Sequence, residues 1–236
     1  MRFLCLHGMG ANAQVLEIQI AAITSSFPEH EFVFAEGLEP CLPDPKVQSF
    51  LSGPYLCYYS CPTPTQMHEA FTLIREVMDE DGPFEGVIGF SQGAALAASM
   101  ILQHQKDNPT AMPLFNLAIF LGASLPFDMD SSLALRSIVA MHHRPNGYPD
   151  GAGDDPLILQ QYDPRTTNLR IEIPTLHVIG RTDPFRQQGE LLVELSSGDA
   201  IPVVHDAGHI VPRDMGSTAK IVRLVEGMIG RAQHIC

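Results

Sequence analysis

The sequence predicts an α/β fold, with a mostly parallel central sheet and helices on both of its faces. Short apolar runs alternate with longer amphipathic segments along most of the 236 residues, which is the pattern of βαβ units. The run Leu117–Leu121 is wholly apolar, as expected of a strand covered on both faces. Hydrophobic residues make up 45% of the chain, enough for a sizeable core. We therefore expect a single domain over residues 1–236.

The expected strands are short and apolar. They are Phe3–Leu6, Phe32–Ala35, Phe84–Gly89, Leu117–Leu121, Leu176–Ile179 and Ile201–Val204. A helix is predicted over Asn12–Ser26, because Asn12 is a suitable N-cap and Val15, Ile18 and Ala22 then share one face. Later helices are expected at Gly93–Gln105, Phe185–Leu195 and Ile221–Arg231.

Two stretches interrupt this alternation. Residues Gly37–Pro64 are rich in Pro, Gly and Ser and predict a long irregular connection. Thr63 to Gln66 then have the pattern of a capping box, which predicts a helix from Pro64 to about Asp79. Between Ser124 and Asn168 the alternation weakens and turn residues gather. We expect residues 124–168 to form a small insertion, acting as a lid or substrate wall.

Charge and cysteine content exclude some functions. The chain carries 27 acidic against 14 basic residues, a net charge of −13, which argues against nucleic-acid binding and a polybasic membrane anchor. No stretch approaches the ~18 apolar residues of a membrane span. The five cysteines are an odd number, which favours a reducing compartment, and we expect a cytoplasmic protein.

The strongest motif is Gly89-Phe90-Ser91-Gln92-Gly93, a G-x-S-x-G sequence between an expected strand and an expected helix. This is the context of a nucleophile elbow, in which a sharp turn exposes the serine and its neighbours must be small. The alternative is an ordinary strand-to-helix turn. A serine nucleophile also needs a histidine base and an acid that orients the base, in the order Ser, Asp, His.

His209 is the predicted base among the ten histidines, because it alone lies on a loop that follows a late strand. His142 and His143 fall in the expected insertion and are predicted to face solvent, whereas His7 and His205 fit structural roles at strand ends.

Asp183 is the predicted acid, since it follows the strand Leu176–Ile179 across a short turn. It could instead be the N-cap of the next helix. Asp206 is an alternative acid, but it is too near His209 in the loop to reach the ring well.

An oxyanion hole requires two aimed N–H donors. We predict the backbone N–H of Gln92, directly after Ser91, and that of Met9, between Gly8 and Gly10. No P-loop and no dinucleotide fingerprint occurs, and the cysteine spacing does not fit a metal site. We therefore expect neither metal nor organic cofactor.

These motifs together resemble the serine hydrolase family called FSH, from Phe3 to about Val225. The resemblance rests on Gly89–Gly93, Leu6–Gly8, Gly180–Asp183 and His205–Pro212. It implies an α/β-hydrolase fold and maps the family's catalytic residues to Ser91, Asp183 and His209. Residues 6–13 are most similar to the fungal branch, whose thioesterases release polyketides. The resemblance thus implies an acyl thioester or ester substrate and an acyl carrier protein of a polyketide synthase as partner.

Two other functions stay open at this stage: a general short-chain carboxylesterase, and a small-molecule receptor on a hydrolase fold. Four apolar residues are candidates for an acyl pocket or for ordinary core: Leu125, Phe127, Leu157 and Leu159. Arg181, Arg186 and Arg213 flank the Asp183 and His209 loops. They are candidates for a basic rim that binds a carrier protein, or are solvated surface arginines.

Overall fold

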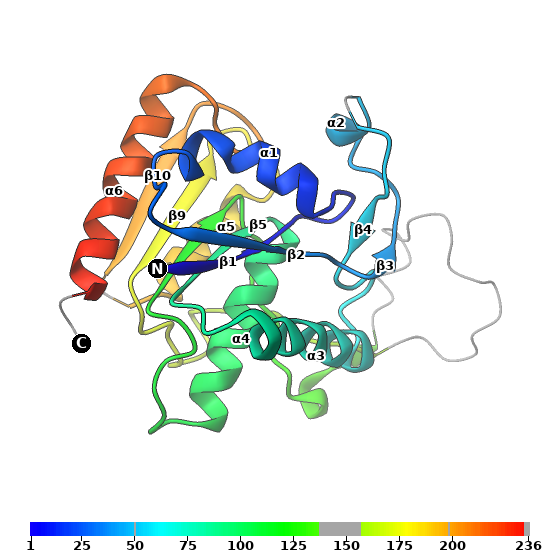
Figure 1. Cartoon of the computed structure of the whole chain (residues 1–236). Coiled ribbons are helices and arrows are strands. Elements are labelled where there is room, and N and C mark those ends of the chain that lie inside the picture. Colours follow the sequence, from blue (N-terminus) through cyan, green and yellow to red (C-terminus); the bar gives the residue numbers. More distant parts are fainter. Residues whose placement is uncertain (50, 137–156, 198, 234–236) are drawn as a thin grey trace.

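The computed structural model describes residues 1–49, 51–136, 157–197 and 199–233. Its centre is a six-stranded sheet in the order β10-β9-β6-β5-β1-β2, with every neighbouring pair parallel (Figure 1). The strands are β1 (Arg2–Leu6), β2 (Glu31–Ala35), β5 (Gly86–Phe90), β6 (Leu117–Leu121), β9 (Thr175–Gly180) and β10 (Ala200–His205). The predicted α/β fold with a parallel sheet is confirmed.

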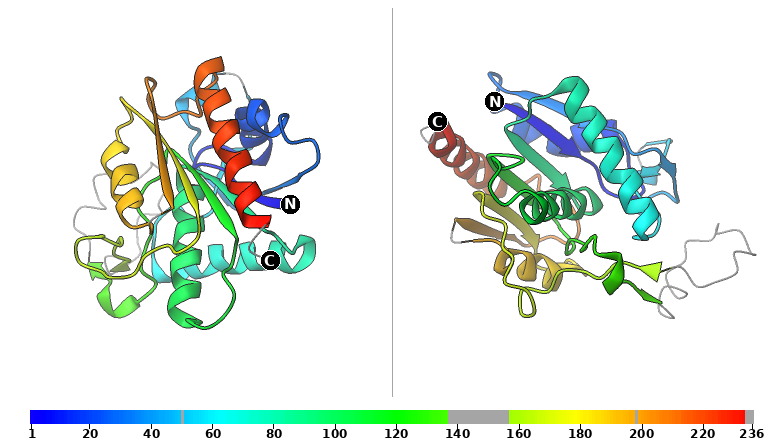
Figure 2. Two further views of the ribbon diagram at one scale, coloured as in Figure 1. Left: turned by 90° about the vertical axis from the view of Figure 1, so that its left-hand side faces the viewer. Right: turned by 90° about the horizontal axis from the view of Figure 1, so that it is seen from below.

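Helices cover both faces of this sheet. One face packs against α1 (Ala13–Thr24) and α6 (Met215–Gln233) (Figure 2). The opposite face packs against α3 (Pro64–Asp81), α4 (Gln92–Asp107) and α5 (Arg186–Glu194). Two cores result, one on each side of the sheet.

Alternate residues of a strand enter opposite cores, because successive side chains of a strand point to opposite faces. In β1, Phe3 and Cys5 pack on the α1 and α6 side, whereas Leu4 and Leu6 pack on the α3 and α4 side. All five residues of β6 are buried. The wholly apolar composition of Leu117–Leu121 therefore follows from burial on both faces.

The capping residues begin their helices as predicted, with one difference. Asn12 Oδ1 accepts a hydrogen bond of 2.8 Å from the Val15 N–H, and Thr63 Oγ1 accepts one of 3.2 Å from the Gln66 N–H. The Thr63 N–H, which a capping box would direct to Gln66, donates to Cys61 O at 2.8 Å. Gln66 Oε1 accepts from the N–H groups of Ser60 and Cys61, each at 2.9 Å. Gln66 thus fixes the chain that enters α3.

The three residues predicted to share one face of α1 are not all buried. Its buried residues are Val15, Leu16, Ile20 and Ile23. Ile18 is 43% exposed. Leu16, Ile20 and Ile23 pack toward β1 and α6. Because α1 is apolar along more than one face, the sequence alone does not decide which face is buried.

The connection between β2 and α3 contains short elements that the sequence did not indicate. Antiparallel strands β3 (Glu39–Pro40) and β4 (Leu56–Cys57) flank the single-turn helix α2 (Pro45–Gln48). Backbone hydrogen bonds join this stretch to the loop after β1: Gly10 N–H to Leu56 O at 3.0 Å, and Asp44 N–H to Gly10 O at 2.9 Å. We call residues 37–58 the excursion. It lies beside the β1–α1 loop.

The stretch expected to be an insertion is described in part. It contains a 3₁₀ turn (Ser131–Leu133) and an antiparallel pair, β7 (Leu135–Arg136) with β8 (Leu157–Ile158). Residues 137–156, including His142 and His143, lie outside the described residues. A lid or substrate wall at 124–168 stays a prediction.

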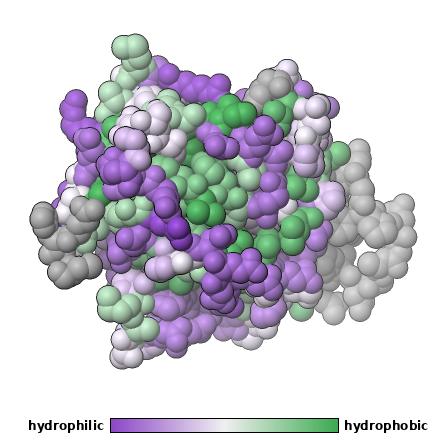
Figure 3. All heavy atoms as spheres, viewed as in Figure 1, coloured by the Kyte–Doolittle hydropathy of each residue, from purple (hydrophilic) through white to green (hydrophobic). Residues whose placement is uncertain are grey.

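No helix among the described residues is long and apolar enough to cross a membrane. On the face shown in Figure 3, hydrophobic residues form a central area bordered by hydrophilic ones. This mixed surface agrees with a charged-residue content of only 17%.

Candidate active site

Ser91 lies at a sharp turn between β5 and α4. Its φ of 53° and ψ of −114° are strained values, and within the described ranges no other non-glycine residue has a positive φ. A residue held in such a region costs about 1–3 kcal/mol. A Cβ on Gly89 would lie 2.5 Å from the backbone N of Ala94. The small residue that the motif requires at this position is therefore needed for steric reasons.

His209 joins Ser91 to Asp183. Its Nε2 lies 2.9 Å from Ser91 Oγ, and its Nδ1 lies 2.8 Å from Asp183 Oδ2. Because a carboxylate only accepts, Nδ1 carries a proton and Nε2 accepts from the serine hydroxyl. The three residues come from the loops after β5, β9 and β10. Parallel strands end at one edge of the sheet, so residues far apart in sequence meet there.

Asp183 has both of the roles considered from the sequence. Oδ2 accepts from His209, while Oδ1 accepts a 2.7 Å hydrogen bond from the Phe185 N–H at the start of α5. Burial opposes ionisation of this carboxyl, but the hydrogen bonds from His209 and Phe185 outweigh it, so its pKa lies below the usual value. Asp206 instead forms an exposed ion pair with Arg181 at 2.8 Å. The carboxylate that accepts the hydrogen bond from His209 is therefore that of Asp183, and not that of Asp206.

The loop after β1 closes against the serine turn. A Cβ on Gly8 would lie 3.3 Å from Ser91 Cβ, and one on Gly93 would lie 2.6 Å from the His7 carbonyl oxygen. Met9 lines the same pocket as Ser91, and Gln92 is the first residue of α4. The two amides predicted for an oxyanion hole thus lie on segments that contact each other beside Ser91.

The Gln92 side chain ties the excursion to the serine turn. Its Oε1 accepts from the Tyr58 N–H at 2.9 Å, and its Nε2 donates to Tyr59 O at 2.7 Å. The carboxamide is thereby directed into the protein. The predicted oxyanion-hole donor of Gln92 is its backbone N–H, which these side-chain bonds leave unaffected.

His7 fixes the loop that carries Met9. Gly37 N–H donates to Nε2 at 2.9 Å, so Nδ1 carries the proton and donates to Gly8 O at 2.8 Å. Burial lowers the pKa of His7 to about 4, so the ring is neutral near neutral pH. Gly8 O and Met9 N–H belong to one peptide plane and point in opposite directions. His7 therefore sets the direction of the Met9 N–H.

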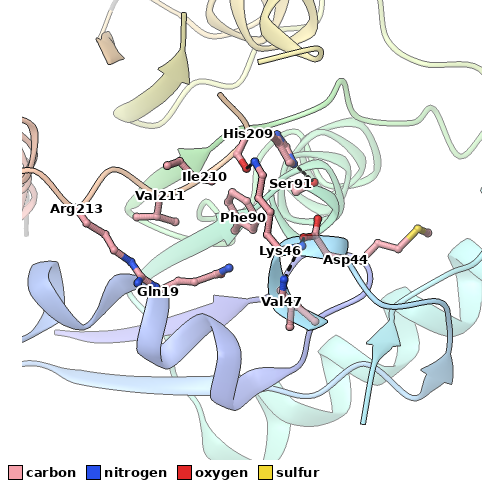
Figure 4. A pocket seen from close by; sticks show the side chains of 12 residues that line it. Gln19, Asp44, Lys46, Val47, Phe90, Ser91, His209, Ile210, Val211 and Arg213 are labelled. Atoms are coloured by element: carbon pink, nitrogen blue, oxygen red, sulfur yellow. Dashed lines mark hydrogen bonds between the residues drawn. The ribbon is translucent and has the colours of Figure 1, made fainter. Parts of the chain in front are cut away.

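A pocket with a volume of about 260 Å³ opens beside Ser91 and His209 (Figure 4). Its lining comes from the β1–α1 loop, α1, the excursion, Phe90 and the chain after His209. The excursion contributes Asp44, Lys46 and Val47. Sequence analysis missed these three because no motif marks them. The only available signal was the Asp44-Pro45 pair, which is typical of a helix start.

The four apolar candidates do not line this pocket. Leu125 and Leu159 are buried in the core on the α3 and α4 side, Phe127 packs against that core, and Leu157 is 46% exposed. The core interpretation fits Leu125 and Leu159. Residues 137–156 lie outside the described residues, so their contacts with Leu125 and Leu159 are not described.

The three candidate rim arginines do not form one cluster of free charges. Arg181 pairs with Asp206, and Arg186 pairs with Glu190, each at 2.8 Å. Arg213 alone of the three lines the pocket. Within the described ranges, no group of three or more His, Cys, Asp or Glu side chains could hold a metal ion.

Comparison with known proteins shows the family of this chain. The family model described as "Serine hydrolase (FSH1)" matches residues 1–221. This chain belongs to the FSH1 serine hydrolase family. The predicted family resemblance is therefore confirmed, and the protein is an ester-cleaving serine hydrolase.

Its curated relatives include fungal esterases. The chain is 33% identical to esterase FPY3 of Fusarium mangiferae, over 98% of each chain. It is 31% identical to esterase FUS5 of Gibberella moniliformis, over 95% of this chain and 85% of the relative. A solved carboxylesterase from Mesorhizobium loti has the same fold, with a TM-score of 0.59 and 16% identity over 96% of this chain and 88% of that one. The α/β-hydrolase fold is confirmed.

Proposed function

We propose that Ser91 is the nucleophile, His209 the base and Asp183 the orienting acid of an acyl transfer to water. One observation carries this proposal: His209 is hydrogen-bonded to Ser91 on one side and to Asp183 on the other. The strained turn at Ser91, its contact with the Gly8 loop and the family membership support it.

The reaction has two halves. His209 Nε2 takes the hydroxyl proton while Ser91 Oγ bonds to the acyl carbon, and the N–H groups of Met9 and Gln92 stabilise the resulting oxyanion. The oxyanion collapses, the bond to the leaving oxygen or sulfur breaks, and His209 gives that atom its proton. Water then attacks the acyl carbon and loses a proton to His209. The bond between that carbon and Ser91 Oγ breaks, His209 returns the proton to Oγ, and the acid leaves. Asp183 stabilises the imidazolium in both halves.

Labelling with a fluorophosphonate probe tests this assignment. The wild-type enzyme should be labelled stoichiometrically, and Ser91→Ala should not be labelled. Ser26→Ala, at an exposed serine outside the pocket, is the matched control and should be labelled like the wild type. Labelling of folded Ser91→Ala at another residue would overturn the proposal.

The substrate we propose is an acyl or polyketide thioester on a carrier protein. The similarity of residues 6–13 to polyketide-releasing fungal thioesterases and the fungal origin of the curated relatives support it. The paired state of Arg181 and Arg186 lends no support to a carrier-binding rim at those residues.

A short-chain carboxylesterase is the second candidate, because the pocket of about 260 Å³ lies below the ~300–1,000 Å³ of typical ligand sites. Matched acyl thioesters and oxygen esters of increasing chain length separate the two. Preference for thioesters, greatest on a carrier protein, supports the first candidate. Hydrolysis confined to short oxygen esters supports the second, and ligand binding without turnover would support a receptor instead.

We also propose a cytoplasmic location. The odd cysteine count and the free thiols of Cys5, Cys41 and Cys57 support it. Fractionation of cells that express the protein tests this location.

A further inference from the structure

The pocket beside Ser91 contains two cationic side chains, Lys46 and Arg213. In the described parts of the chain, no carboxylate lies within 4.0 Å of either one. The chain has 14 basic residues and a net charge of −13. The lining of this pocket thus has two cations without an ion-pair partner among the described residues, although the whole protein is strongly acidic.

The nearby acidic residues are directed elsewhere. Asp44 lines the pocket, but its Oδ1 accepts from the backbone N–H groups of Lys46 and Val47, at 2.8 and 3.3 Å, where it caps α2. Asp214 follows Arg213 in the chain, and its Oδ1 accepts from the Ser217 N–H at 2.8 Å, at the start of α6. Both carboxylates are engaged by helix amides rather than by the pocket's cations.

The two cations lie at opposite ends of the pocket (Figure 4). Lys46 donates through Nζ to His209 O at 3.0 Å, and its ammonium has two further N–H donors. Arg213 lies toward the end of the pocket away from Ser91 (Figure 4). Between them the lining is largely apolar, with Val211 among the residues that a hydrocarbon segment would contact.

We infer that Lys46 and Arg213, at opposite ends of an apolar lining, make this pocket an anion-binding subsite, and that the enzyme acts on esters or thioesters which carry a carboxylate or phosphate beyond an apolar spacer. This inference rests on the proposed function of Ser91. The anion can belong to the acyl group or to the leaving group, and in either case the subsite recognises the same chemistry. The subsite would add specificity to a pocket that is otherwise mainly apolar.

Three chromogenic esters test the inference. 4-Nitrophenyl butanoate is neutral, mono-4-nitrophenyl glutarate carries a carboxylate on the acyl group, and 5-butanoyloxy-2-nitrobenzoate carries one on the leaving group. We expect the wild type to prefer one of the two anionic esters over the neutral ester by about 5-fold in kcat/KM, the scale of a partly exposed charge pair. The preferred ester identifies the source of the anion. The preference should fall as salt screens the pair.

Arg213→Met should reduce the preference to about 1–2-fold, mainly through the KM of the anionic ester. Lys46→Met should reduce it similarly, and the neutral ester corrects for any shift of the His209 loop. Arg181→Met and Arg186→Met are matched controls, because each removes an arginine that is already paired and outside the pocket lining.

The outcomes are distinguishable. Loss of the preference in the Lys46 and Arg213 variants, with the control variants like wild type, supports the subsite. Equal rates on all three esters in the wild type, or an equal loss on all three in Arg213→Met, would overturn it while leaving Ser91 as nucleophile. Absence of hydrolysis of every ester by the wild type would instead contradict the proposed function.

Discussion

Two sides of the pocket at Ser91 are built in different ways. On one side Ser91, Asp183 and His209 stand on loops at the ends of parallel strands, joined by hydrogen bonds of 2.8 and 2.9 Å. On the other side the excursion supplies Lys46 and Val47 from a single-turn helix. The first side has the geometry for the reaction itself, which is the same for every substrate. The second side is a loop without regular secondary structure along most of its described length, and loops of this kind are suited to selecting among substrates.

The two sides are tied together by buried polar groups. His7 follows β1, yet its Nε2 accepts from Gly37 N–H at the start of the excursion. The Tyr58 hydroxyl, at the end of the excursion, accepts from the His7 N–H at 3.0 Å and donates to Ala35 O at 2.9 Å. We call the side with Ser91, Asp183 and His209 the strand-end side. Substitutions there should mainly alter kcat, whereas substitutions of residues that line the pocket should mainly alter KM.

The largest effect is expected from Asp183→Asn. Asparagine retains an oxygen for the Phe185 N–H, but it no longer provides the charge that orients and stabilises the His209 ring. We expect kcat to fall by about 10³–10⁴-fold, with little change in KM or melting temperature. Steady-state kinetics and thermal unfolding measure both.

Asp206→Asn is the matched control for the acid. It removes only an exposed ion pair with Arg181, so kcat should stay within about twofold of wild type. A loss in Asp206→Asn as large as that in Asp183→Asn would contradict the geometry.

A second contrast separates core from pocket. Leu159 is 2% exposed, and Leu159→Ala should lower the free energy of unfolding by about 2–5 kcal/mol with kcat/KM unchanged. Ile210 lines the pocket and is 37% exposed, so Ile210→Ala should raise KM at little cost in stability. Urea unfolding measures the stability of the two variants, and the kinetics of ester hydrolysis measure their kcat and KM. A rise in KM in Leu159→Ala without change in Ile210→Ala would place the acyl group at Leu159.

Acid should destabilise the fold. Burial lowers the pKa of His7 to about 4 and that of His177 to about 3, from 6.5. Below pH 6.5 the unfolded chain therefore binds protons that the folded chain does not, so stability is complete above that pH and falls as the pH drops toward 4. The lowered pKa of Asp183 acts in the same direction at lower pH.

Between pH 7.5 and pH 5 we expect the free energy of unfolding to fall by about 2–4 kcal/mol. Urea titrations at the two pH values measure it, and His177→Gln should show a smaller fall than wild type. An unchanged free energy in the wild type would mean that these histidines are protonated in the folded state.

His7→Ala tests the connection between the two sides. Losing the bond to Gly8 O should leave the Met9 amide poorly aimed, with kcat reduced by about 10–100-fold and KM little changed. Affinity for a trifluoromethyl ketone, which mimics the oxyanion, should fall in parallel. His177→Ala, at an equally buried histidine remote from Ser91, should lose stability but not ketone affinity. If both variants lost stability and ketone affinity to the same extent, His7 would have only a structural role.

The strand-end side was predictable from sequence, and the excursion was not. Every parallel strand was placed within two residues, because runs such as Leu117–Leu121 must be apolar on both faces. Ser91, Asp183 and His209 followed from their places after those strands, and the structure brings them together.

The excursion depends instead on long-range backbone hydrogen bonds, such as that between Gly10 N–H and Leu56 O. Amino-acid composition does not reveal these bonds. The sequence therefore contained no indication that Lys46 lies in the pocket. Leu125 and Leu159 were ambiguous for a similar reason, since an apolar side chain suits a core and an acyl pocket equally well.

The order of the strands also has a consequence for synthesis of the chain. During translation, β6 leaves the ribosome well before β9, its neighbour in the sheet, because the chain from Leu121 to Thr175 must be made between them. At a translation rate of about 5–20 residues per second, β6 remains without this neighbouring strand for about 3–11 s. During this interval Leu117–Leu121 has an unpaired backbone edge on the side that β9 later occupies.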